Sequence, residues 1–130
     1  MAMILAVALG SAIGGVARLL LGAAMQQRLG PGFPVGTLVI NITGSLLLGF
    51  LMRLALATSA ISPEMRGFLT TGLCGGYTTF STFTYETMAL LNDGELGRAG
   101  TYVAASVALA LLGVYLGAAA AGGLIALRQR

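Results

Sequence analysis

The amino-acid sequence predicts an all-α membrane protein with four transmembrane helices. Of its 130 residues, 57% are hydrophobic and only 8% are charged, whereas a soluble domain keeps roughly a quarter of its residues charged. The apolar residues form long stretches that match the roughly 20 residues needed to cross a bilayer. An apolar surface of this extent would form patches that soluble monomers do not tolerate. We therefore expect a single membrane-embedded domain covering residues 1–130.

The first two spans are expected at residues 2–25 and 35–57. The first contains one charged residue, Arg18, and no basic residue precedes its apolar core, which argues against a secretory signal peptide. Glycine and proline dominate residues 30–34, including Pro31, and predict a turn. The second span follows this turn, with Arg53 as its only charge.

The third span, at residues 63–91, is predicted to break in the middle of the membrane. Ser62, Pro63 and Glu64 suit the N-cap, the first helical position and the first turn of a helix. Residues 72–84 then combine glycines with a run of Thr and Ser, which are weaker helix formers than Ala. The alternative is a continuous helix in which the glycines only permit close packing.

The fourth span is expected at residues 98–127, after a polar turn at residues 92–95, so that both termini lie on one side. The side with the termini carries only slightly more arginines than the other side, which fits insertion in both orientations. The first side has Arg53, Arg66, Arg128 and Arg130, and the other has Arg28 and Arg98. Pairs of glycines spaced four apart predict close helix packing and oligomerisation; these pairs are Gly10/Gly14, Gly72/Gly76 and Gly113/Gly117.

Several chemistries are excluded by composition. The chain has no His and no Trp, and all seven basic residues are Arg. No Ser-His-Asp triad, His-ligated zinc or Lys-dependent phosphate loop can be built from these residues, so we expect no enzyme. The single Cys74 is interpreted as a small apolar filler. The net charge of +3 comes from scattered arginines, which predict membrane-flanking contacts with lipid rather than a nucleic-acid surface.

A break at membrane depth would create a buried site, because lipid cannot satisfy the freed backbone groups. Free carbonyls there suit a cation, and free N–H groups suit an anion. On the second span, Thr37, Asn41 and Ser45 recur at helical spacing and form one polar face. This face serves either to join helices or to line a polar track for a permeating species.

The third span carries aromatic and polar candidates near the break. Phe80 and Phe83 are helical neighbours, and their electropositive ring edges could stabilise a small anion; the alternative places both rings in the core or against lipid. Glu86 is an intramembrane acid and a functional candidate. Arg18 in the first span either reaches the interface or lines an aqueous vestibule. On the fourth span, Tyr102 and Ser106 continue a polar face.

Three motifs resemble the Fluc (CrcB) family of bacterial fluoride channels. Residues 75–83 read Gly-Gly-Tyr-Thr-Thr-Phe-Ser-Thr-Phe and are followed by Glu86. Residues 14–18 read Gly-Gly-Val-Ala-Arg, and residues 36–45 read Gly-Thr-Leu-Val-Ile-Asn-Ile-Thr-Gly-Ser. Together with the four-span layout, the resemblance covers essentially the whole chain.

The resemblance implies an antiparallel, dual-topology homodimer in the bacterial inner membrane. Its two pores would pass fluoride down its gradient and relieve fluoride toxicity. Phe80 and Phe83 would line the pore, and Asn41 would donate an amide N–H to fluoride. A polar track would include or border Thr37, Ser81, Thr82, Glu86, Tyr102 and Ser106.

The resemblance also implies a vestibule and a metal site. Arg18 would lie in the vestibule, and backbone carbonyls of Gly75 and Thr78 from both subunits would hold a structural Na⁺ at the centre of the dimer. One departure is Ala110, which stands where a hydroxyl residue would extend the polar track along the fourth span.

Two other functions fit four short spans. A small multidrug-type exporter would exchange protons for cationic drugs at a membrane Glu, but Glu86 lies in the third span rather than the first, and no Trp is present to stack on a cation. A non-conducting membrane assembly subunit would use its polar residues only to join helices.

Overall fold

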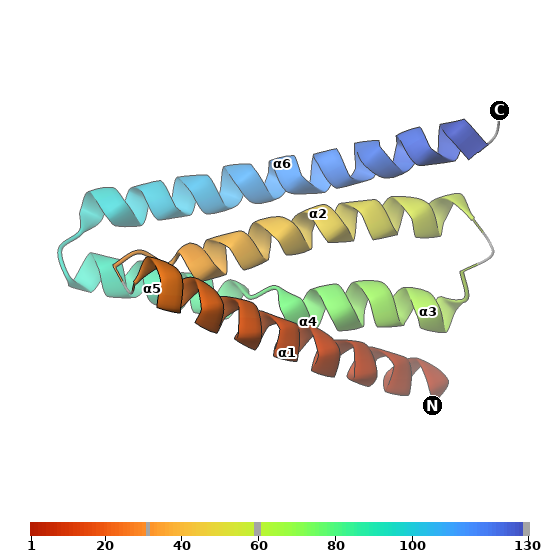
Figure 1. The fold of residues 1–130 in the computed structure, drawn as a ribbon, viewed down its shortest axis with the longest axis horizontal. Helices are drawn as coiled ribbons and strands as arrows, with labels where there is room; N and C mark the ends of the chain where they lie inside the picture. The colour runs from red at the N-terminus through yellow and green to blue at the C-terminus, as the bar shows by residue number, and fades with distance from the viewer. Residues whose placement is uncertain (31, 59–60, 129–130) are drawn as a thin grey trace.

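The computed structural model describes residues 1–30, 32–58 and 61–128, and within these ranges every regular element is helical. Pro31 and Arg130, which entered the turn and charge predictions, lie outside the described residues. The elements in chain order are α1 (Ala2–Leu29), α2 (Val35–Ala57), α3 (Pro63–Gly67), the π-helix η1 (Phe68–Cys74), α4 (Gly75–Tyr77), α5 (Phe80–Asn92) and α6 (Leu96–Arg128) (Figure 1).

The helices form an elongated bundle. Helix α2 packs chiefly against α6, and α1 packs chiefly against η1 and α4. Figure 1 shows that α1 begins and α6 ends at the same end of the bundle, and that the run from α3 to α5 extends from that end to the other. The run therefore lies lengthwise beside the longer helices, as the predicted third span should.

Helices α1, α2 and α6 are long and apolar enough to cross a membrane. Their outer faces expose large apolar side chains, among them Leu5, Leu9, Leu19, Leu111 and Leu124. Such a surface is stable against acyl chains rather than water. The prediction of an all-α, multi-pass membrane protein is thus confirmed.

The predicted start of the third segment is confirmed, whereas two helices run further than predicted. The Ser62 hydroxyl accepts a hydrogen bond from the Met65 N–H at 3.2 Å, and Pro63 occupies the first helical position. Helix α1 continues through its polar last turn and ends at Leu29; the next residue, Gly30, caps it with a φ of 76°, which suits glycine. Helix α6 begins at Leu96 rather than at residue 98, directly after the polar turn, and the Ala99 N–H donates to the Glu95 carbonyl at 3.0 Å.

The glycine pairs are used for close packing within the chain, as predicted. A Cβ at Gly72 would lie 2.8 Å from the Val7 carbonyl oxygen, and one at Gly76 would lie 2.6 Å from that of Ser11. Gly10 and Gly14 face this same contact from α1, and Gly113 and Gly117 face α2 from α6. Backbones can therefore approach closely at both contacts.

The predicted break of the third segment is confirmed, at Thr78 and Thr79. Helix α4 ends at Tyr77 and α5 begins at Phe80. Between them Thr78 (φ −78°, ψ 161°) and Thr79 (φ −152°, ψ 114°) are extended. The glycines themselves stay helical. The preceding π-helix was not predicted; its wide turn brings the Gly75 N–H to the Thr70 carbonyl, five residues back.

Candidate functional site

One side chain of α2 satisfies the backbone that the break frees. The Thr79 N–H donates to Asn41 Oδ1 at 2.8 Å, and Asn41 Nδ2 donates to the Thr79 carbonyl at 3.0 Å. Within a bilayer these two groups would otherwise remain without partners, at a cost on the order of several kcal/mol each. Asn41 therefore holds the extended link in place.

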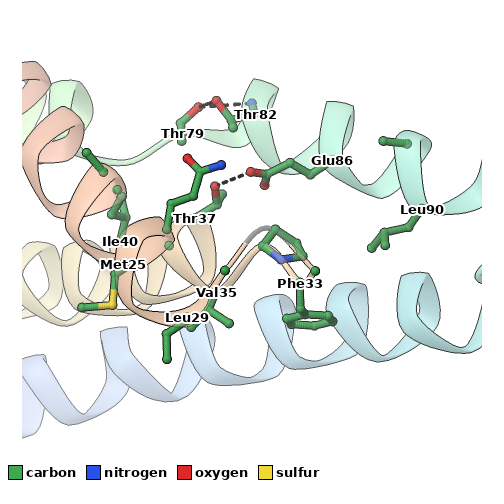
Figure 2. A pocket seen from close by; sticks show the side chains of 18 of the residues that line it. Met25, Leu29, Phe33, Val35, Thr37, Ile40, Thr79, Thr82, Glu86 and Leu90 are labelled. Carbon is green, nitrogen blue, oxygen red and sulfur yellow. Dashed lines mark hydrogen bonds between the residues drawn. The ribbon is translucent and has the colours of Figure 1, made fainter.

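Further contacts fix the residues on both sides of the link. The Thr78 hydroxyl donates to the Cys74 carbonyl at 3.0 Å, and Arg18 Nη1 donates to the Thr78 carbonyl at 3.3 Å. Thr79 is the N-cap of α5: its hydroxyl accepts from the Thr82 N–H at 3.2 Å and donates to the Thr82 hydroxyl at 2.9 Å. Figure 2 shows these two threonines together at the edge of a cavity.

That cavity, here called the polar cavity, has a volume of about 750 Å³. Figure 2 shows Thr37 and Glu86 pointing toward one another across it. The two oxygens of Glu86 accept hydrogen bonds from the Thr37 hydroxyl at 2.8 Å and the Tyr102 hydroxyl at 2.7 Å. The polar and charged residues that line the polar cavity are Arg18, Gln26, Thr37, Thr79, Thr82, Glu86, Asp93, Glu95 and Arg98.

A second cavity, here called the phenyl cavity, has a volume of about 390 Å³ and lies between α2, α5 and α6. The rings of Phe80 and Phe83 line it, with centroids 5.5 Å apart and planes tilted by 45°. Its polar atoms are neutral, and none of the described residues that line it is charged. They are Asn41, Ser45, Leu48, Thr78, Thr79, Phe80, Phe83, Ser106, Val107, Ala110, Leu111 and Val114.

The Ser106 hydroxyl has no hydrogen-bond partner in the part of the chain that the structure describes. Its oxygen is buried, and no described group accepts or donates a hydrogen bond to it. The residue lines the phenyl cavity. Because a buried hydroxyl without a partner is costly, this group is suited to bind a guest in that cavity.

The structure brings most of the predicted site residues together at the two cavities. Arg18, Thr37, Thr82 and Glu86 line the polar cavity, and Asn41, Phe80, Phe83 and Ser106 line the phenyl cavity. Tyr102 is fully buried and lines neither, but it binds Glu86. Ser81 is exposed and also lines neither cavity; its hydroxyl lies 3.4 Å from that of Thr79.

The structure adds Thr79 to the residues predicted for the site. Thr79 lines both cavities, which makes it the residue between them. A threonine N-cap before a helical run is the signal that could have singled it out. Ser45, third in the polar face of α2, lines the phenyl cavity, as does Ala110, which brings no hydroxyl there.

The two carbonyls predicted to bind Na⁺ differ in their surroundings. The Thr79 N–H, which would bond the Gly75 carbonyl in a continuous helix, donates to Asn41 instead. The Thr78 carbonyl accepts from Arg18, but a carbonyl oxygen has a second lone pair. Both oxygens thus retain the capacity to accept a ligand, with a guanidinium beside one of them.

The fold and the two cavities define a multi-pass membrane protein with a polar site inside an apolar helical bundle. The chain belongs to the CrcB family: the family model described as "CrcB-like protein, Camphor Resistance (CrcB)" matches residues 5–118. This confirms the family resemblance and the prediction that the chain is not an enzyme.

Three similar proteins share the name fluoride-specific ion channel FluC. The fluoride-specific ion channel FluC of Rhizobium meliloti (strain 1021) is 50% identical over 116 residues, which are 89% of this chain and 93% of that protein. FluC of Geobacter sulfurreducens is 50% identical over 121 residues, or 93% and 98% of the two chains. FluC of a Thermus thermophilus strain is 49% identical over 121 residues, or 93% and 94%.

Proposed function

We propose that this protein is a fluoride-selective ion channel that passes F⁻ passively across the membrane. The observation that carries the proposal is the phenyl cavity, in which neutral hydrogen-bond donors and two phenyl rings meet without a charged side chain among the described lining residues. The names of relatives at about half identity support the same substrate.

Fluoride poses a particular physical problem because it is small and strongly hydrated. A dry pore must replace the water shell with donors in fixed positions, yet bind weakly enough to release the ion. The Ser106 hydroxyl and the second N–H of Asn41 Nδ2 supply neutral donors, and the ring edges of Phe80 and Phe83 add weaker attraction. A fixed cation in this position would hold the ion too firmly.

The proposed path runs from the polar cavity to the phenyl cavity past Thr79. The polar face of α2 follows it, with Thr37 at the first cavity and Asn41 and Ser45 at the second. Arg18 at the polar cavity attracts anions into this vestibule, while Thr37, Thr82, Glu86, Tyr102 and Ser81 belong to or border the polar track. Ala110 ends the hydroxyl track on α6.

The working assembly is proposed to be an antiparallel, dual-topology homodimer with two pores. Phe80 is 76% exposed in the isolated chain although it lines the phenyl cavity, and a second subunit would cover it. In this assembly the broken run from α3 to α5 would make the third of four crossings. Location in the bacterial inner membrane follows from the family resemblance.

A structural Na⁺ at the centre of this dimer is part of the proposal. Carbonyls of Gly75 and Thr78 from both subunits would hold it, and its charge would tie the two breaks together. The expected effect is a higher melting temperature in Na⁺ than in N-methylglucamine, together with a dimeric mass by light scattering in detergent. Equal melting temperatures would argue against the cation site, and a monomeric mass against the dimer.

Fluoride efflux from liposomes tests the channel itself. Purified protein is expected to release F⁻ but not Cl⁻, as followed with ion-selective electrodes, and Phe80→Ile or Phe83→Ile should cut the fluoride flux. Tyr115→Ile, at an exposed aromatic residue of α6, is the matched control and should leave it unchanged. Equal passage of chloride would refute the proposal, and proton-coupled efflux of cationic drugs would favour an exporter.

A further inference from the structure

Gly44 lies on α2 against the extended link that separates α4 from α5. The residue is buried. A Cβ at this position would overlap the Cγ2 methyl of Thr78 and would lie 3.0 Å from Cδ1 of the Tyr77 ring. Since real Cβ atoms do not approach other heavy atoms this closely, a side chain at position 44 requires the link or the helix to move.

The Thr78 methyl cannot turn away without a cost. The hydroxyl on the same Cβ donates to the Cys74 carbonyl at 3.0 Å. A rotation about χ1 that moved the methyl would also move this hydroxyl away from that carbonyl. β-Branched side chains also have few alternative χ1 positions. Losing a hydrogen bond in apolar surroundings is unfavourable, so the backbone of Thr78 is the part that yields.

A shift of this backbone is transmitted to the phenyl cavity. The Thr78 carbonyl is bound by Arg18, and both backbone groups of Thr79 are bound by Asn41, one turn before Gly44 on the same helix. Phe80 follows directly, and its ring lines the phenyl cavity together with Thr78. The space at position 44 therefore sets where the ring stands relative to Asn41.

We infer that Gly44 is a positioning residue of the pore. The absence of its side chain lets the Thr78 methyl seat against α2, and this contact fixes the Phe80 ring at the phenyl cavity. Gly44 itself lines neither cavity. The inference rests on the proposed channel function and adds to it a residue that acts only through shape.

A double-mutant cycle with Gly44→Ala and Thr78→Ser tests the inference. Thr78→Ser keeps the hydroxyl that binds Cys74 but removes the methyl that an alanine would meet. Gly44→Ala is expected to lower fluoride efflux from liposomes at least about tenfold in the wild-type background and less than about threefold in the Thr78→Ser background. Equal reductions in the two backgrounds, or an unchanged flux in the single variant, would overturn the inference.

Two other glycines provide controls. A Cβ at Gly100 meets nothing within 4 Å, so Gly100→Ala should leave flux unchanged. Gly49, on the same helix as Gly44, faces the backbone of Val114 in α6. Any loss of fluoride flux in Gly49→Ala should therefore not be restored by Thr78→Ser. If Thr78→Ser restored flux equally in Gly44→Ala and Gly49→Ala, the cause would be a general loosening of the bundle, and a specific contact at position 44 would be contradicted.

Selectivity and folding separate the remaining outcomes. Per folded channel, Gly44→Ala should reduce the ratio of fluoride to chloride flux, which a loss of folded protein alone would not change. If Gly44→Ala does not fold, the double variant decides: a monodisperse, conducting protein supports the inference, and an unfolded or silent one refutes it. A silent wild type would refute the proposed function, and the same cycle in melting temperature would then test the contact itself.

Discussion

Replacing Asn41 with alanine should loosen the break and abolish conduction together. The change removes two hydrogen bonds, one to each backbone group of Thr79. An unpaired buried backbone group costs about 1–3 kcal/mol, and single interhelical hydrogen bonds in membranes average about 0.6 kcal/mol. For two hydrogen bonds these figures give a fall in the free energy of unfolding of about 1–6 kcal/mol. Unfolding in SDS, followed by far-UV circular dichroism, measures this quantity.

Two companion variants make the result specific. Asn41→Asp keeps an acceptor for the Thr79 N–H but loses the donor to its carbonyl and places a charge at membrane depth, so it should also destabilise the protein. The added charge should stop fluoride flux. Asn92→Ala, at an exposed asparagine that ends α5, should change stability by less than about 0.5 kcal/mol. If Asn41→Ala matches this control in stability and flux, the break is held by other groups and the argument from Asn41 is wrong.

Two further predictions concern stability and conduction separately. Ser106→Ala should reduce fluoride flux severalfold without lowering the free energy of unfolding, because the hydroxyl is buried without a partner among the described residues; a large stability loss would show that it has one. Gly117→Ala should destabilise the bundle by about 1–3 kcal/mol, because a Cβ there would overlap the Leu46 carbonyl oxygen of α2. Gly100→Ala is the comparison for that measurement, and equal stability of the two variants would contradict the packing argument.

Local features of the sequence predicted much of the architecture. The apolar stretches predicted the helical membrane class, Ser62 and Pro63 predicted the start of α3, and the spaced glycines predicted close packing. Each of these depends on residues near one another in the chain. The polar face of Thr37, Asn41 and Ser45 was visible for the same reason, because helical periodicity alone places them together.

Only the tertiary structure decided how these features are used. The glycines of the third segment suggested where the helix would break, but Gly72 and Gly76 stay helical. They are glycine because a side chain at either position would meet the backbone of α1. The break lies at Thr78 and Thr79, where Asn41 supplies both missing backbone partners from 38 residues away.

The same distinction applies to the cavities. The sequence by itself determined which groups could serve the site: neutral donors, two phenyl rings and one membrane acid. Packing decided that Glu86 is bound by Thr37 and Tyr102, and that Thr79 stands between the two cavities. The physical reason is that propensity and hydropathy are properties of neighbouring residues, whereas a hydrogen bond between helices exists only once their faces meet.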